Sequence, residues 1–260
     1  MTSFDHSHSR WTAVLERVSR RGMVDYELLA ADASDLEAYL EDLGSVDRKQ
    51  YRAWSNAEQL AFWINAYNAF TVKLMARHHP VRGIRAIGWF PGWAFLTPVV
   101  RLAGLRRTLN LYWLEHLILR RKFDEPRVHF AINCASFSCP RLRPEAYRAA
   151  DLDEQLEDAA RSFLRDPTHN RVDRDRRVLQ LSSLFRWFRS DFGATEEAVV
   201  AWTMRYFRQE DRRWVRTHWP IRVEYLPYDW SAPCELPESF YEAPQKKGAA
   251  GMATPSEGWR

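Results

Sequence analysis

Cysteine, glycine and lysine are scarce in this chain. Its 260 residues include three cysteines, which are too few for a disulfide framework, and their odd number leaves at least one thiol unpaired. Ten glycines exclude a collagen-like chain, and an apolar content of 46% with 28% charged residues excludes disorder throughout. A chain of this length buries enough surface to fold without a disulfide or a metal ion.

Long apolar runs are also missing. The longest weakly polar stretch, residues 88–100, is interrupted by Pro91 and Pro98 and is too short to span a bilayer. The first ten residues are polar and rich in histidine and serine, and the apolar segment of a signal peptide does not follow them. We therefore expect a soluble, cytoplasmic protein with reduced thiols and no membrane partner.

Arginine supplies almost all of the basic charge. The chain has 33 arginines and 5 lysines, and its net charge is only +4. Guanidinium groups bind phosphates and carboxylates bidentately, but the same bias follows from genome composition. Two basic clusters abut predicted helices and fit solvated helix faces, so we expect no nucleic-acid partner. They comprise Arg106, Arg107, Arg120, Arg121 and Lys122, and Arg205, Arg208, Arg212, Arg213 and Arg216.

Helical periodicity dominates the chain. Ser55 and Glu58 form a capping box in front of the strongest helix. Helices are expected at residues 11–20, 34–43, 56–77, from 108 or 110 to 119, from 151 to about 166, from 182 or 183, and at 196–207. Strands are expected at residues 127–133, 171–172, 177–181 and 221–226. The pattern predicts an α+β fold: a helix-rich single domain over residues 10–240 with a small, mostly antiparallel sheet, then a disordered tail over 241–260.

The segment from His129 to Pro140 contains two thiols, Cys134 and Cys139, just after a predicted strand. Backbone N–H groups at such a junction can lower the pKa of a thiol and stabilise an oxyanion. The spacing is neither the C-x-x-C of thioredoxin-like proteins nor that of a zinc knuckle. A disulfide between the two is sterically possible but is not implied. The alternative is that both thiols are simply small buried apolar groups.

Two amides interrupt an otherwise apolar helix. Asn65 and Asn68 lie on one helical face, where buried amides must find hydrogen-bond partners. They can satisfy the backbone of a loop, or they can orient a catalytic group or bind a polar substrate.

Histidine offers two candidate bases for a thiol. Glu115 and His116 are adjacent on a predicted helix and so point about 100° apart. In a regular strand, His129 would face away from Cys134, which makes His116 an equally good partner. A zinc site from both histidines and both thiols is conceivable, but the usual ligand spacings are missing, so we expect no metal. Dinucleotide, Walker A and G-x-S-x-G motifs are also missing, so we expect no cofactor.

Several segments of the chain together resemble the family of unknown function called DUF547. They occur in the family's order between Glu58 and Trp230. The segments are LAFWINAYNAF (60–70), LEHLIL (114–119), RVHFAINCASFSCP (127–140), LQLSSLFRWFRSDF (179–192) and YDW (228–230).

The resemblance implies which residues occupy the family's motif positions, although it implies no settled activity. Those residues are Asn65, Asn68, Glu115, His116, Arg127, His129, Asn133, Cys134, Ser138, Cys139 and Pro140. Domains similar to this one are fused to glutaredoxin or DEP modules in some eukaryotic proteins, which favours thiol chemistry. The chain departs from the family at residues 110–113, where an acidic residue is usual, and at residues 135–137, where small residues are common.

The leading hypothesis is a thiol-dependent hydrolase or acyl transferase acting on a small molecule or peptide. Its catalytic set is Cys134 or Cys139 as nucleophile, His116 or His129 as base, and Glu115 and Asn65. Its substrate-binding set is Asn68, Asn133, Arg127 and Ser138. The alternatives are a dithiol that cycles through a disulfide with a glutaredoxin-like redox partner, and a non-catalytic interaction module.

Overall fold

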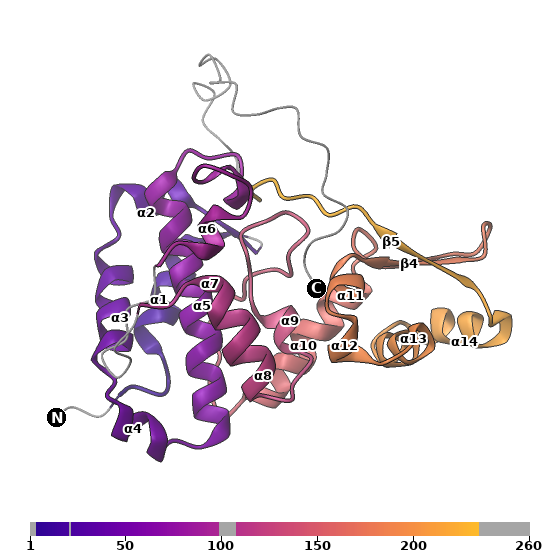
Figure 1. Ribbon diagram of the computed structural model, residues 1–260, viewed down its shortest axis with the longest axis horizontal. Helices are drawn as coiled ribbons and strands as arrows, with labels where there is room; N and C mark the ends of the chain where they lie inside the picture. The colour runs from indigo at the N-terminus through magenta and orange to yellow at the C-terminus, as the bar shows by residue number, and fades with distance from the viewer. Residues whose placement is uncertain (1–3, 21, 99–107, 234–260) are drawn as a thin grey trace, which may run out of the picture.

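The computed structural model describes residues 4–20, 22–98 and 108–233 (Figure 1). Within them the predicted helix-rich α+β fold is confirmed. Cys234, the basic pair at 106–107 and the predicted tail over 241–260 lie outside the described residues. A single domain over residues 10–240 stays a prediction.

The amino-terminal half is mostly helical and includes one short antiparallel pair of two-residue strands. Its elements are α1 (Ser9–Val18), β1 (Ser19–Arg20), β2 (Met23–Val24), α2 (Tyr26–Ala31), α3 (Ser34–Ser45), α4 (Arg48–Ala53), α5 (Asn56–His78), η1 (Ile84–Ala86) and α6 (Trp93–Leu96). The predicted capping box begins α5: the Ser55 hydroxyl accepts from the Glu58 N–H, and the Glu58 carboxylate accepts from the Ser55 N–H. Almost every residue of α5 from Leu60 to Ala76 is buried, as in a helix surrounded by the rest of the core.

One continuous helical segment follows, formed by α7 (Leu111–Trp113), η2 (Leu114–Leu119) and α8 (Arg120–Lys122). The Asn110 side chain caps it by accepting from the Trp113 N–H at 2.8 Å, so the predicted start is confirmed. Its middle, η2, is a π-helical turn that packs against α5. Such turns often occur at functional sites.

The strand predicted over residues 127–133 is wrong. Residues Val128–Ala131 form a short helix, α9, through turn hydrogen bonds such as that from the Phe130 N–H to the Arg127 carbonyl. Every residue from Val128 to Asn133 is buried. The β-branched and aromatic composition therefore reflects burial on all sides, not one face of a sheet.

The carboxyl-terminal half contains the three-stranded sheet. Its elements are α10 (Leu152–Arg165), β3 (Arg171–Asp173), β4 (Val178–Ser182), α11 (Leu184–Trp187), α12 (Arg189–Phe192), α13 (Glu196–Met204), α14 (Gln209–His218) and β5 (Arg222–Leu226). The predicted hairpin is confirmed, since β3 pairs antiparallel with β4. The strand β5 pairs with β4 in parallel after the four intervening helices, so the three-stranded sheet is mixed.

Two hydrophobic clusters form the core, and α9 lies where they meet. Val128 and Ala131 belong to the amino-terminal cluster around α5. Phe130 belongs to the carboxyl-terminal cluster, which packs around β4 and α10–α13. In Figure 1, α9 accordingly lies between the two halves of the molecule. The segment that follows α9 contains both thiols.

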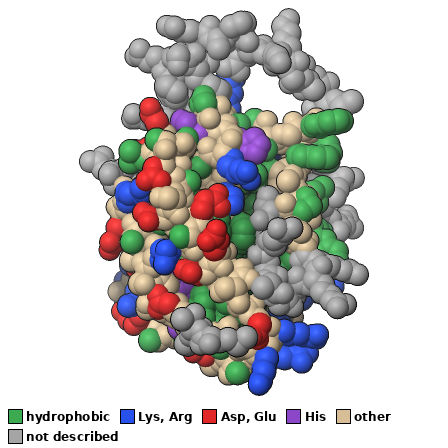
Figure 2. All heavy atoms as spheres, turned by 90° about the vertical axis from the view of Figure 1, so that its left-hand side faces the viewer, with side chains coloured by type: hydrophobic (Ala, Val, Ile, Leu, Met, Phe, Trp, Pro, Cys, Tyr) green, Lys and Arg blue, Asp and Glu red, His purple; other side chains and the backbone are tan. Residues whose placement is uncertain are grey.

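The surface seen in Figure 2, the left-hand side of Figure 1, carries intermingled acidic and basic side chains. This face therefore presents no large patch of one sign.

Both asparagines of α5 bind loop backbone. The Asn65 amide donates to the Tyr147 carbonyl at 2.7 Å and accepts from the Tyr147 N–H at 3.0 Å. The Asn68 amide donates to the Ala131 carbonyl at 2.9 Å and accepts from the Asn133 N–H at 2.8 Å. Asn68 thus joins α5 to the backbone on either side of Ile132, directly before the first thiol.

We expect Asn68→Leu, which keeps the shape of the side chain, to lower the free energy of unfolding by about 2–4 kcal/mol, because it leaves two buried backbone groups unpaired. The matched control is Thr71→Val on the same helix. The Thr71 hydroxyl is buried without a hydrogen-bond partner among the described residues, so its removal should be neutral or stabilising. Urea denaturation measures both, and equal losses would contradict the role of Asn68.

Candidate functional site

A disulfide joins Cys134 and Cys139 in the loop that follows α9. Their Cα atoms are 6.3 Å apart, within the range that a disulfide spans. The expectation of reduced thiols therefore does not describe this structure. The loop is closed at its base by Asn133, whose side chain accepts from the Ala135 N–H at 2.7 Å and donates to the Pro140 carbonyl at 2.6 Å.

The two sulfurs have different surroundings. Cys139 is buried, with 6% of its surface exposed, whereas Cys134 is partly exposed. The Cys139 sulfur accepts hydrogen bonds from the Cys134 backbone N–H at 3.0 Å and from the Tyr228 hydroxyl at 3.1 Å. The Cys134 sulfur lies 3.3 Å from the Ser136 hydroxyl and 3.4 Å from that of Tyr228. The Cys139 sulfur thus has the shorter hydrogen bonds and is less accessible than the Cys134 sulfur.

The segment after β5 holds Tyr228 against the disulfide. The Ser138 N–H donates to the Asp229 carbonyl at 3.1 Å, and the Ser138 hydroxyl accepts from the Asp229 N–H at 2.9 Å. The Tyr228 ring also packs on Trp187 and Trp230, with ring centroids 4.9 and 4.6 Å away. Ser138, a predicted substrate ligand, therefore anchors the loop.

A partly buried carboxyl, that of Glu115, acts electrostatically on Tyr228. Glu115, on the π-helical turn, accepts a hydrogen bond from the Tyr67 hydroxyl at 3.2 Å. Burial raises the pKa of Glu115 to about 7, against the opposing effects of the Tyr67 hydroxyl and the Arg120 charge. Burial, together with the charge of Glu115, raises the pKa of Tyr228 above its ordinary range, so this phenol stays protonated. Glu115 is therefore the group of this cluster that titrates near neutral pH.

His129 is bound to a carboxylate from α12. Its Nε2 lies 2.7 Å from Asp191, and Arg120 binds the same carboxylate through two nitrogens at 2.6 and 2.9 Å. Burial opposes ionisation of Asp191, but hydrogen bonds from His129 and Arg120 outweigh it and hold its pKa below the usual range. Burial lowers the pKa of His129, although Asp191 opposes this effect.

His116 packs against rings and does not bind a sulfur. Its ring centroid lies 4.2 Å from that of Tyr112 and 6.0 Å from that of Phe188. Burial, with a contribution from Arg120, lowers its pKa to about 4, so the ring is neutral at pH 7. Its Nδ1 is buried without a hydrogen-bond partner among the described residues. Neither candidate base is hydrogen-bonded to a thiol sulfur in the described part of the chain.

Residues 51–164 match the model of a family described as "Protein of unknown function, DUF547". The predicted resemblance to DUF547 is confirmed. The match begins in α4, includes α5, η2, α9 and the cysteine loop, and ends in α10. The DUF547-like segments at 179–192 and 228–230, which supply Asp191 and Tyr228, lie beyond it. Comparisons with curated proteins and with solved structures found no match.

The remaining DUF547 motif residues predicted to bind substrate have partners within the protein. Arg127 makes a bidentate ion pair with Glu125 at 2.6 and 2.8 Å and binds Asp153 at 2.7 Å. Asn68 and Asn133 bind the backbone of the cysteine loop. Asn68 and Asn133 thus support the loop that contains the two cysteines, whereas Arg127 joins the start of α9 to Asp153 on α10.

Sequence reasoning missed four residues of the site: Tyr67, Arg120, Asp191 and Tyr228. Three of them, Tyr67, Asp191 and Tyr228, occur in segments that resemble DUF547, which was the available signal. Arg120 lies in a basic cluster that fits a solvated helix face in the sequence.

Two further searches were confined to residues 4–20, 22–98 and 108–233. No three His, Cys, Asp or Glu side chains gather there in a way that could hold a metal ion. No helix there combines the length and apolar character needed to cross a membrane.

The raised pKa of Glu115 predicts a pH-dependent stability difference. Because folding favours the neutral carboxyl, its contribution to stability is complete below the unfolded pKa near 4.5 and is lost as the pH rises through about 7. Glu115→Gln should therefore gain stability relative to the wild type between pH 4.5 and 8, by about 1–3 kcal/mol. Denaturant unfolding across this range, with exposed Glu41→Gln as control, measures it. A difference that does not change with pH would contradict the assignment.

Proposed function

We propose that this chain is a thiol/disulfide exchange protein in which Cys134 and Cys139 cycle between dithiol and disulfide. The observation that carries the proposal is the disulfide between two cysteines of unequal exposure. Exchange requires a sulfur that a partner can reach and a second sulfur that can leave and return. Cys134 fits the first role and Cys139 the second.

In the first step, a thiolate of a reducing partner attacks the Cys134 sulfur. A bond forms between the partner and Cys134, and the bond to Cys139 breaks. The Cys139 sulfur leaves with the electron pair as a thiolate. It already accepts hydrogen bonds from the Cys134 N–H and the Tyr228 hydroxyl, which favour its negative charge. Such stabilisation of the leaving group accelerates exchange.

In the second step, another thiolate of the partner attacks the partner's own sulfur in the mixed disulfide. The partner becomes a disulfide, Cys134 leaves as a thiolate, and the cysteine pair has gained two electrons. Two protons then complete the dithiol. Cys134 takes its proton from solvent. For the buried Cys139 we assign the donor role to Glu115, which titrates near pH 7 and acts electrostatically on the Tyr228 hydroxyl that is bound to this sulfur.

Hydrolase or acyl-transfer chemistry receives less support from the same geometry. A thiol nucleophile needs a base within hydrogen-bond reach. His129 instead binds Asp191, and His116 packs among aromatic rings. A dithiol protein of the glutaredoxin type supplies both thiolates that the exchange requires. Glutathione can replace it if two molecules supply one thiolate each.

A glutathione redox titration, with trapped thiols counted by mass spectrometry, tests the proposal. In a Cys234→Ser background, the pair should convert between dithiol and intramolecular disulfide with a potential between about −180 and −270 mV, the range of exchange proteins. A purely structural disulfide should resist reduction to below about −300 mV.

Single cysteine variants test the assigned roles. In that background Cys139→Ser should accumulate a glutathione adduct on Cys134, whereas Cys134→Ser should accumulate little adduct on buried Cys139. Tyr228→Phe should slow reduction by about 3- to 10-fold, because it removes a hydrogen bond to the leaving sulfur. Tyr225→Phe, on β5, is the matched control. A preferred adduct on Cys139, or no intramolecular disulfide at any potential, would overturn the proposal.

A further inference from the structure

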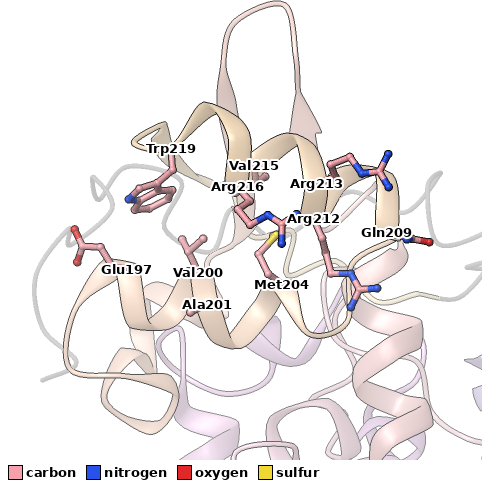
Figure 3. Close-up of a pocket in the computed structure, with 10 residues that line it drawn as sticks. All are labelled: Glu197, Val200, Ala201, Met204, Gln209, Arg212, Arg213, Val215, Arg216 and Trp219. Carbon is pink, nitrogen blue, oxygen red and sulfur yellow. The ribbon is translucent and has the colours of Figure 1, made fainter.

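A groove of about 700 Å³ separates the helices α13 and α14 (Figure 3). Buried Val200 and Val215 and partly buried Met204 form its floor. Figure 3 shows Trp219 and Glu197 facing each other at one end of the groove. The groove is open to solvent along its length, so it can receive a surface of another molecule.

Three arginines of α14 line the same groove: Arg212, Arg213 and Arg216. All three are exposed. None of their guanidinium groups makes an ion pair or side-chain hydrogen bond within the described part of the chain. Their acidic neighbour Asp211 is held by Arg174 at 3.1 Å instead. The groove therefore combines an apolar floor with three cations that have no ion-pair partner among the described residues.

The end of the groove opposite the cations is different. Trp219 is a large apolar side chain that remains 38% exposed, and Ala201 is exposed beside the floor. Glu197 places a carboxylate at this end, which disfavours a continuous phosphate backbone lying along the groove. An occupant must therefore offer apolar groups along its length and carboxylates near the arginines.

We propose that this groove binds an amphipathic helix with acidic residues, presented by a partner protein. The apolar stripe of such a helix packs into a groove between two helices. Carboxylates bordering the stripe pair with Arg212, Arg213 and Arg216, since guanidinium forks bind carboxylates bidentately. The site lies at the far side of the carboxyl-terminal half from α5 and does not depend on the disulfide (Figure 1).

Two designed peptides test the proposal with the full chain. Both have about 16 residues and the same apolar face of Leu and Trp, and their polar faces carry either Glu or Lys. We expect the Glu peptide to bind more tightly by fluorescence anisotropy, with an affinity that falls as salt rises. The triple variant R212Q/R213Q/R216Q should weaken binding of the Glu peptide about tenfold, because the free energies of three exposed ion pairs add up to about this change in affinity.

A matched triple variant separates the groove from net charge. R52Q/R77Q/R121Q removes the same charge from exposed sites elsewhere and should change the affinity by less than about twofold. Ala201→Trp fills the groove without altering charge and should also weaken binding about tenfold.

Four results would overturn the proposal. The first is a Glu peptide that binds no better than the Lys peptide, and the second is an equal loss of affinity in both triple variants. The third is an unchanged affinity of Ala201→Trp in a chain whose thermal unfolding matches the wild type. The fourth is tighter binding of a single-stranded oligonucleotide, or of anionic lipid vesicles, than of the Glu peptide through the same arginines.

Discussion

The hydrogen bonds of the Asn68 side chain hold the site together. This amide lies on a helix surrounded by apolar residues, where it has no access to water. It binds the Ala131 carbonyl and the Asn133 N–H, so it fixes the end of α9 and the start of the cysteine loop on α5. Asn133 then closes the loop across its base. The distance between the two thiols follows from this chain of amide contacts, and so does their environment.

Local signals were sufficient for the longer helices α1, α3, α5, α10 and α13 and for the hairpin, but they did not predict α2, α4 or α14. Ser55, Glu58 and Asn110 act within three residues of the helix starts that they cap, so their effect is visible in sequence. The prediction of a strand over residues 127–133 was wrong because the apolar residues of this segment pack into two different hydrophobic clusters. Val128 and Phe130 would lie on one face of a strand, but they pack into separate clusters. The expectation that His129 faces away from Cys134 assumed a regular strand, so it does not apply to this helix.

The candidate site was predictable only in part. Both thiols and both asparagines stand out in sequence, because polar groups in an apolar setting are rare. Their partners do not, because Asp191 lies 62 residues from His129 and Tyr228 lies 94 residues from Cys134. Such pairings depend on how the halves of the chain pack, and a single sequence contains no local trace of that packing.

The contact between Ser138 and Asp229 spans 91 residues of chain. Contacts at such separation are slow to form, because a long loop must close first. The stretch that matches the family model contains both cysteines. It does not contain Tyr228 and Asp229, which follow β5 and donate hydrogen bonds to Cys139 and Ser138. During synthesis the thiols emerge well before Tyr228, so the environment of the mature disulfide is completed only when the last strand docks. The two thiols are therefore exposed on the growing chain before the Tyr228 hydroxyl that binds their sulfurs has been synthesised.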